Sequence, residues 1–120
     1  MTAPETVTTA AREIARRFVD AFNARDAETL RALLGEDAEL RTLSGGSLRG
    51  HDGLAALLRV AEERELRLVP FRPPTAERDG DNVRVILPIR ELIGPDDIER
   101  RAEFDVRDGR IVAFAVQPFE

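Results

Sequence analysis

The spacing of apolar residues changes along the chain, and this change limits the folds that the sequence can adopt. Up to about residue 65, apart from a short stretch at 38–43, apolar side chains recur every three or four positions, as on a helix face. Beyond that point they alternate with polar side chains, as in strands with one covered face. The pattern predicts an α+β fold in which helices and a sheet share one core.

Three helices are expected in the first half of the chain. From about Thr6 to Ala24, five apolar residues have helical spacing: Ala11, Ile14, Ala15, Phe18 and Phe22. Asp26 can cap a second, short helix that Gly35 ends. A third helix begins near His51, and its buried stripe is Leu54, Leu57, Leu58 and Ala61.

Strands are expected at 38–43, 66–71, 83–93, 98–106 and 110–116. Glycine-containing turns separate the later ones, and Asp108–Gly109 is a strong hairpin signal. The expected order is helix, helix, strand, helix and four strands. Three N-terminal helices packed on a curved, mostly antiparallel sheet would bury all of these stripes.

The size and charge of the chain limit its organisation and partners. With 120 residues, it fits a single domain spanning 1–120, in which residues 1–5 are expected to be a flexible end. Eighteen basic and 23 acidic residues give a formal charge of −5, so nucleic acid is not an expected partner. The chain has neither a signal-peptide pattern nor an apolar run of roughly 20 residues, so we expect no membrane association and a cytoplasmic location.

Cysteine and histidine usage excludes several kinds of site. The sequence contains no cysteine, so disulfides and thiolate chemistry are absent. A single histidine, His51, cannot form a histidine-rich metal site, and no loop has the alternating acids of a calcium site. We therefore expect no metal and no cofactor.

Four segments resemble the SnoaL-like, nuclear-transport-factor-like family, which includes polyketide cyclases and ketosteroid isomerase. They are FVDAFNARD (18–26), LLGEDA (33–38), LRGHDGL (48–54) and FDVRDGRI (104–111), and they occur in the family's order. The resemblance implies an α+β cone around an apolar pocket. It does not imply one reaction, because this fold hosts cyclases, isomerases, epoxide hydrolases, dehydratases and non-catalytic modules.

Three activities of the family can be compared with this sequence. Ketosteroid isomerase needs a tyrosine, a carboxylate base and a protonated aspartate, and the resemblance places Phe18, Thr42 and Ala102 at these positions. None carries the required group, which argues against that activity. In the cyclases an acidic residue, often with a histidine, lies near the final strands, whereas here Gln117 can orient a carbonyl but cannot accept a proton. The epoxide hydrolases use an acid–arginine–acid relay across neighbouring strands. Residues of the right types are Arg90, Glu91, Arg101, Glu103 and Asp105, and which of them point inward stays open.

Strand alternation selects Glu91 as the candidate catalytic acid. It shares a face with the apolar residues of 83–89 and is expected to reach the mouth of the cone, with Arg100 as its partner. An ordinary exposed ion pair at the rim is the alternative. A bulge at Pro88 would reverse the alternation and turn Glu91 outward. His51 is the second catalytic candidate, beside the alternative of a partly exposed residue in the first turn of a helix.

The predicted pocket lining combines apolar residues with a few polar contacts. Its members are Phe18, Phe22, Leu40, Thr42, Leu54, Leu58, Arg100, Phe104 and Gln117. The apolar members fill the core in the alternative interpretation.

Two functions remain open, and so does the question whether the protein is an enzyme. The first is a cyclase, isomerase or hydrolase that acts on a small apolar, oxygenated molecule. The second is a non-catalytic ligand-binding or dimerisation module whose cone is largely filled by side chains. The last strands are also apolar on their second face, at Ile86, Pro88, Ile111, Ala113 and Ala115. That pattern, together with the family resemblance, predicts a homodimer through the outer sheet face.

Overall fold

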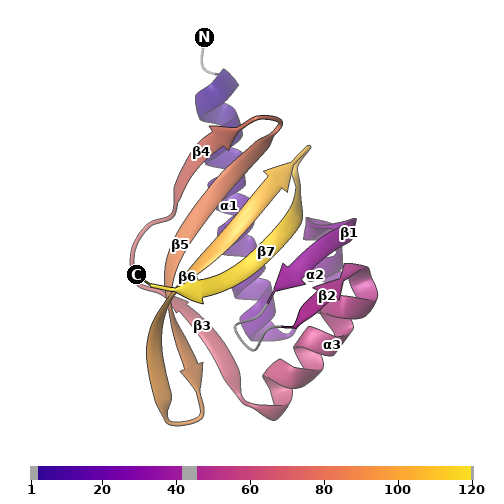
Figure 1. The fold of residues 1–120 in the computed structure, drawn as a ribbon, viewed down its shortest axis with the longest axis vertical. Coiled ribbons are helices and arrows are strands. Elements are labelled where there is room, and N and C mark those ends of the chain that lie inside the picture. The colour runs from indigo at the N-terminus through magenta and orange to yellow at the C-terminus, as the bar shows by residue number, and fades with distance from the viewer. Residues whose placement is uncertain (1–2, 42–45, 120) are drawn as a thin grey trace.

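The computed structural model describes residues 3–41 and 46–119, with side chains from residue 6 onward. Within them, three helices and seven strands form the expected α+β fold (Figure 1). The helices are α1 (Ala3–Ala24), α2 (Ala27–Leu33) and α3 (Gly50–Glu63). The strands are β1 (Leu34–Arg41), β2 (Ser47–Arg49), β3 (Leu66–Pro70), β4 (Thr75–Asp79), β5 (Asn82–Ile93), β6 (Asp96–Arg107) and β7 (Arg110–Pro118).

The strands form one sheet in the order β2-β1-β7-β6-β5-β3, and β4 also pairs with β5. All neighbouring strands are antiparallel except β1 and β7, so the expected mostly antiparallel sheet is confirmed. The long β5 pairs with β3 over one half and with β4 over the other. The sequence analysis did not identify β2 or β4, because both are short and mostly exposed and lack an apolar alternation.

The helices cover one face of this sheet. Figure 1 shows α1 running behind the strands, with α2 and α3 beside β1 and β2. Four phenylalanines join α1 to β6 and β7. The Phe18 ring centroid lies 4.8 Å from that of Phe114 and 5.5 Å from that of Phe104, and Phe22 stacks on Phe18 at 6.2 Å. Every buried side chain among those described is apolar.

Strand registers decide which side chains face the helices. The β5–β6 ladder runs without interruption from Val83↔Val106 to Ile93↔Asp96, so no bulge occurs at Pro88. The β6–β7 ladder does shift, because Ala113 pairs with Asp105 whereas Ile111 pairs with Val106. The extra residue, Val112, turns Ile111 inward, where its side chain is completely buried. The expectation that Ile111 lies on the outer face was therefore wrong.

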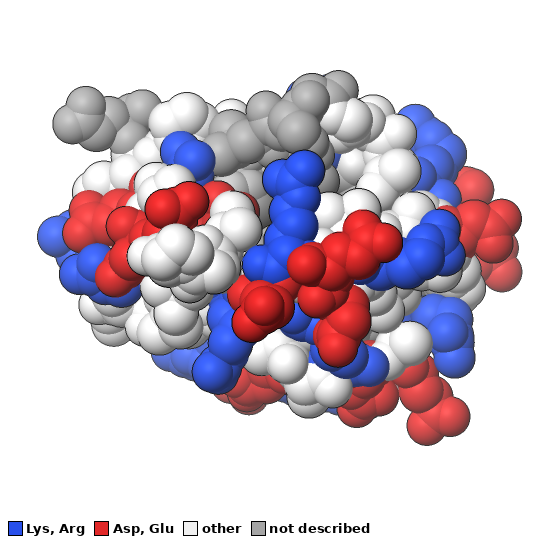
Figure 2. All heavy atoms as spheres, turned by 90° about the horizontal axis from the view of Figure 1, so that it is seen from below, with Lys and Arg blue, Asp and Glu red and all other residues white. Residues whose placement is uncertain are grey.

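The surface carries interspersed charges. Seen from the end at which the β5–β6 turn lies, basic and acidic side chains adjoin one another (Figure 2). No described helix has the length and apolar character needed to cross a membrane. The described residues also contain no group of three or more His, Asp or Glu placed to hold a metal ion.

Two glycines with similar backbone angles offer a matched test of the packing at the start of α3. Gly50 has a φ of +68° and Gly80 a φ of +63°. A methyl group at Gly50 would lie 2.6 Å from the carbonyl oxygen of Glu36, whereas none of the described atoms lies within 4 Å of one at Gly80.

We expect Gly80→Ala to cost about 1–2 kcal/mol of unfolding free energy, the ordinary penalty of a left-handed alanine. Gly50→Ala should cost about 1–3 kcal/mol more, because the backbone must also move to relieve the clash. Urea unfolding of both variants measures the difference. Equal losses would show that α3 is not held against β1 at this contact.

Candidate functional site

A pocket of about 520 Å³ lies between the end of α1, α3 and one end of the sheet. We call it the cone pocket. Its lining consists of Phe22, Gly46, Leu48, Leu57, Val60, Arg64, Leu66, Leu68, Glu91, Ile93, Arg100, Phe114 and Val116. The buried rings of Phe22 and Phe114 both contact Phe18, so the aromatic cluster closes the inner end of the pocket. Apolar side chains make up most of the wall.

One ion pair stands in this apolar wall. Arg100 Nε donates to Glu91 Oε1 at 3.2 Å, and the side chains are 24% and 12% exposed. Ile89 is the direct partner of Arg100, so Glu91 reaches it diagonally from the same face of β5. The pair is therefore far less solvated than an ion pair at the rim of a protein.

The pair leaves hydrogen-bonding groups available to a ligand. It uses one nitrogen of Arg100 and one oxygen of Glu91. Within the described part of the chain, the two Nη atoms of Arg100 and Oε2 of Glu91 have no other partner, and none of them is sealed from solvent. Guanidinium donors and a carboxylate acceptor are thus presented side by side in an apolar pocket.

The structure brings three of the predicted site residues together: Phe22, Glu91 and Arg100 line the cone pocket. Three others lie elsewhere in the core, where Phe18, Leu40 and Phe104 are completely buried and fill the space beyond the pocket. Their predicted role in ligand contact is not supported by these positions. Thr42 lies outside the described residues.

The remaining predicted residues lie in other hollows. His51 is exposed, and with Leu54 and Leu58 it lines a groove of about 430 Å³ between α2 and α3. Gln117 pairs with Arg101 on the outer face of the sheet, opposite to the face that carries Val116. Neither His51 nor Gln117 can therefore act on a molecule held by Glu91.

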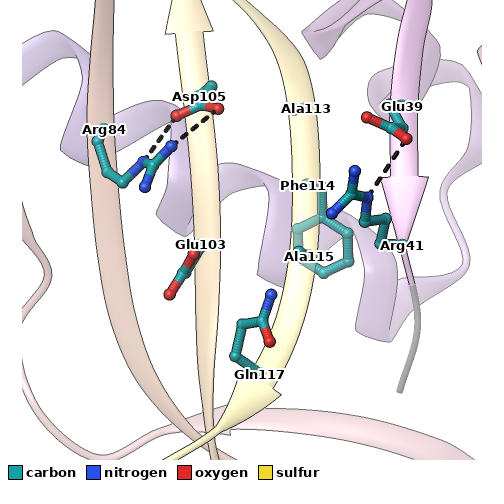
Figure 3. A pocket seen from close by; sticks show the side chains of 9 residues that line it. All are labelled: Glu39, Arg41, Arg84, Glu103, Asp105, Ala113, Phe114, Ala115 and Gln117. Carbon is teal, nitrogen blue, oxygen red and sulfur yellow. Dashed lines mark hydrogen bonds and ion pairs between the residues drawn. The ribbon is translucent and has the colours of Figure 1, made fainter. Parts of the chain in front are cut away.

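The outer face has its own shallow depression of about 240 Å³ (Figure 3). It lies over the small side chains of Ala113 and Ala115, and two ion pairs flank it. Arg84 binds Asp105 through contacts of 2.9 and 3.4 Å, and Arg41 Nε lies 3.3 Å from Glu39 Oε2.

These outer pairs hold their charges. The hydrogen bond and charge of Asp105 raise the pKa of Arg84. Hydrogen bonds from Arg41 and Ser47 lower the pKa of Glu39. Groups stabilised in their charged forms are poor proton donors and acceptors near neutral pH.

Sequence reasoning missed most of the apolar wall. The residues it missed include Leu66 and Leu68 of β3, Val60 of α3 and Val116 of β7. A usable signal existed for one of them, because alternation already places Val116 on the face of Phe114.

Comparison with known proteins supports the architecture. The model of the SnoaL-like domain matches residues 15–114. No curated protein sequence matches the chain. Solved structures do match it. A candidate polyketide cyclase from Sinorhizobium meliloti is 19% identical with a TM-score of 0.69, covering 88% of this chain and 94% of that one.

Two further solved structures carry other proposed activities. A candidate ketosteroid isomerase from Kribbella flavida is 23% identical with a TM-score of 0.70, over 91% of this chain and 77% of that one. An LEH-like epoxide hydrolase from M. tuberculosis is 28% identical with a TM-score of 0.66, covering 91% of this chain and 82% of that one. Their differing names leave the reaction of this chain to be argued from its own pocket.

The environment of Glu91 predicts an asymmetric response to mutation. Arg100→Met should cost about 1–3 kcal/mol of unfolding free energy, because it leaves a little-exposed carboxylate without its donor. Adding Glu91→Gln should recover part of the loss, since the unpaired charge is then gone. Arg78→Met, at an exposed position on β4, serves as the control and should change stability by less than about 0.5 kcal/mol. If Arg100→Met is as mild as the control in urea unfolding, the pair is not desolvated.

Proposed function

The chain belongs to the SnoaL-like domain family, and we propose that it binds a small, apolar, oxygen-bearing molecule in the cone pocket. The observation that carries this proposal is the Glu91–Arg100 ion pair, which is only partly exposed to solvent and lies in an apolar pocket wall. The pocket volume of about 520 Å³ falls within the roughly 300–1,000 Å³ of small-molecule sites. A cone filled by its own side chains, the alternative raised by the sequence, does not fit a pocket of this size.

The geometry supports orientation of the ligand by its oxygen atoms. The apolar body would pack on Phe22, Phe114 and Val116, with the oxygens turned toward the ion pair. A ligand carbonyl can accept from Arg100 Nη, and a ligand hydroxyl can donate to Glu91 Oε2. Few polar groups in an apolar pocket favour a defined pose.

We further propose that Glu91 acts as a general base on a bound carbonyl compound. Its carboxylate would take a proton from the carbon next to the carbonyl. The C–H electron pair would form a carbon–carbon double bond while the π electrons of the carbonyl move onto the oxygen, which gives an enolate. The guanidinium of Arg100 would stabilise that negative charge. Glu91, now protonated, would return the proton to a carbon of the same molecule. The step is balanced without a further reactant.

Other activities of the family are less well supported. A hydrolytic relay of the acid–arginine–acid type needs two carboxylates, and Glu91 is the single one among the described residues that line the cone pocket. His51 faces a different groove, so the proposal assigns proton transfer to Glu91 alone. Binding without catalysis is the competing function, and it shares the same pocket.

Isotope exchange tests both the proposed binding of a carbonyl compound and the proposed role of Glu91 as a base. A panel of small apolar ketones in D₂O should bind the protein, and their α-hydrogens should exchange for deuterium faster than in buffer, as followed by NMR. Glu91→Gln should reduce the protein-dependent exchange by about 100-fold or more, because the amide cannot accept the proton. The dissociation constant should change little, since the amide oxygen can still accept from Arg100.

Glu103→Gln, on the outer sheet face, provides the matched control and should leave exchange unchanged. Binding without exchange in the wild-type protein would leave a binding module and reject Glu91 as a base. Failure of every ketone to bind would reject this class of ligand.

We also propose that a second copy of the chain covers the outer sheet face. Half-buried apolar side chains at Ile86, Pro88 and Ala115 lie on this face beside the paired charges of Arg84 and Asp105. A surface of this composition suits an interface between copies, because its charges already have partners and its small residues allow close approach.

Ala115→Arg should convert the dimer to a monomer, because a long charged side chain would stand at the centre of the interface. Sedimentation velocity measures the change. Ala55→Arg, at an exposed position on α3, is the matched control and should remain dimeric. A wild-type protein that is monomeric at micromolar concentration would contradict the proposed dimer.

A further inference from the structure

We infer that Asn23 and Arg25 are positioning residues of the cone pocket, which hold β3 against the end of α1 so that the pocket keeps its binding shape. This inference rests on the proposed ligand-binding function. Neither residue lines the cone pocket. Each acts through the backbone of elements that do.

Asn23 forms a two-bond pair with an edge strand. Its Nδ2 donates to the carbonyl oxygen of Leu68 at 2.8 Å, and the Leu68 amide donates to its Oδ1 at 2.9 Å. β3 lies at the end of the sheet, with β5 on its other side, so the amide of Asn23 takes the place of a missing neighbouring strand.

The position of this pair along β3 links it to the site. Leu68 lines the cone pocket, and its partner across the β3–β5 ladder is Glu91. In an antiparallel strand the amide and carbonyl of one residue point to the same side. Because both groups of Leu68 point to Asn23, the ladder bonds to β5 do not hold this residue. The side chain of Asn23 therefore provides the main hydrogen bonds that hold the backbone of Leu68, the ladder partner of Glu91.

The guanidinium of Arg25 binds backbone carbonyls of three segments, which are the end of α1, the end of α3 and the start of β3. Its Nη1 donates to the carbonyl of Phe22 at 2.8 Å, and its Nη2 donates to Ala61 at 3.1 Å and Leu66 at 2.6 Å. The carbonyls of Phe22 and Ala61 belong to the last turns of α1 and α3, where helix carbonyls lack intrahelical partners. Nε of Arg25 also lies 3.0 Å from Glu62.

The two residues together restrain three walls of the pocket. Phe22 is on the α1 wall, Leu57 is on the α3 wall and Leu66 begins the β3 wall. The three segments meet where Arg25 binds them. If β3 detaches from α1, the pocket wall beside Glu91 moves, and a ligand that needs all three walls can bind only the attached form.

This coupling has a quantitative consequence. The apparent dissociation constant equals the intrinsic value divided by the fraction of molecules in the binding-competent form. Replacing a residue that only stabilises the fold lowers the melting temperature but does not change this fraction at temperatures well below it. Replacing a positioning residue weakens binding in proportion to the local detachment of β3.

The test compares the contact between α1 and β3 with ligand affinity in the same variants. Nuclear Overhauser effects between α1 and β3 report attachment, and titration with a ketone that binds the wild-type protein reports affinity. Asn23→Leu removes both hydrogen bonds. We expect about tenfold weaker binding, accompanied by weaker Overhauser effects between α1 and β3.

Two further variants keep the test decisive. Asn23→Asp retains the acceptor for the Leu68 amide but sets a carboxylate oxygen against the Leu68 carbonyl oxygen, so it should weaken binding at least as much as Asn23→Leu. It also carries the test if Asn23→Leu does not fold. Val83→Ala, in the core at the far end of β5, should lower global stability while leaving the dissociation constant unchanged.

The outcomes separate the two proposals. If no ketone binds the wild-type protein, the proposed function fails. If a ketone binds the wild-type protein and Asn23→Leu binds it equally well, the positioning role is overturned.

Discussion

The contact of Phe18 with Phe104 and Phe114 is the constraint on which the rest of the architecture depends. It fixes the distance between α1 and the strands at the narrow end of the cone, where side chains fill the interior at the density of a core. Phe22, one helical turn further along, stacks on Phe18 and already borders open space. The pocket therefore begins where the aromatic cluster ends, because the shorter aliphatic side chains beyond it do not bridge the widening gap between α1, α3 and the sheet.

This geometry also explains why an ion pair can persist in an apolar wall. Burying two charges costs free energy that the pair recovers only with good geometry, and apolar residues of similar size often stabilise a fold as well or better. Arg100 and Glu91 are not fully buried, since the open pocket leaves their unused nitrogen and oxygen atoms in contact with solvent. Their stability cost is thereby reduced, and a ligand that displaces this solvent meets donors and an acceptor that are already held in place.

The sequence predicted the direction of a side chain correctly where strand alternation alone determines it. It was misleading where a bulge or another feature changes that alternation. Uninterrupted alternation along β5 was enough to place Glu91 and Arg100 on the inner face, because Pro88 did not introduce a bulge. The same rule failed for Ile111, since a one-residue bulge at Val112 leaves no mark in a run of apolar residues. His51 lies exposed in the first turn of α3, as its alternative interpretation predicted. Periodicity gives the buried stripe of a helix but not which cavity borders its edge. Alternation alone would have put Gln117 on the outer face, opposite to Val116, so the signal was present but was outweighed by the chemistry of its side chain.

The fold is compatible with several reactions, and the number of carboxylates in the pocket reduces the set of reactions that the site can support. A hydrolytic relay divides its tasks between groups that activate water and groups that protonate a leaving oxygen, and two acids linked by an arginine provide both. A proton that is moved within one molecule needs a single group that takes it and gives it back. Glu91 is the one carboxylate among the described residues of the cone pocket, and the role proposed for Arg100 is to stabilise the charge that forms between the two transfers. A single carboxylate supports the proposed proton transfer better than a hydrolytic relay, although one similar structure is that of an LEH-like epoxide hydrolase.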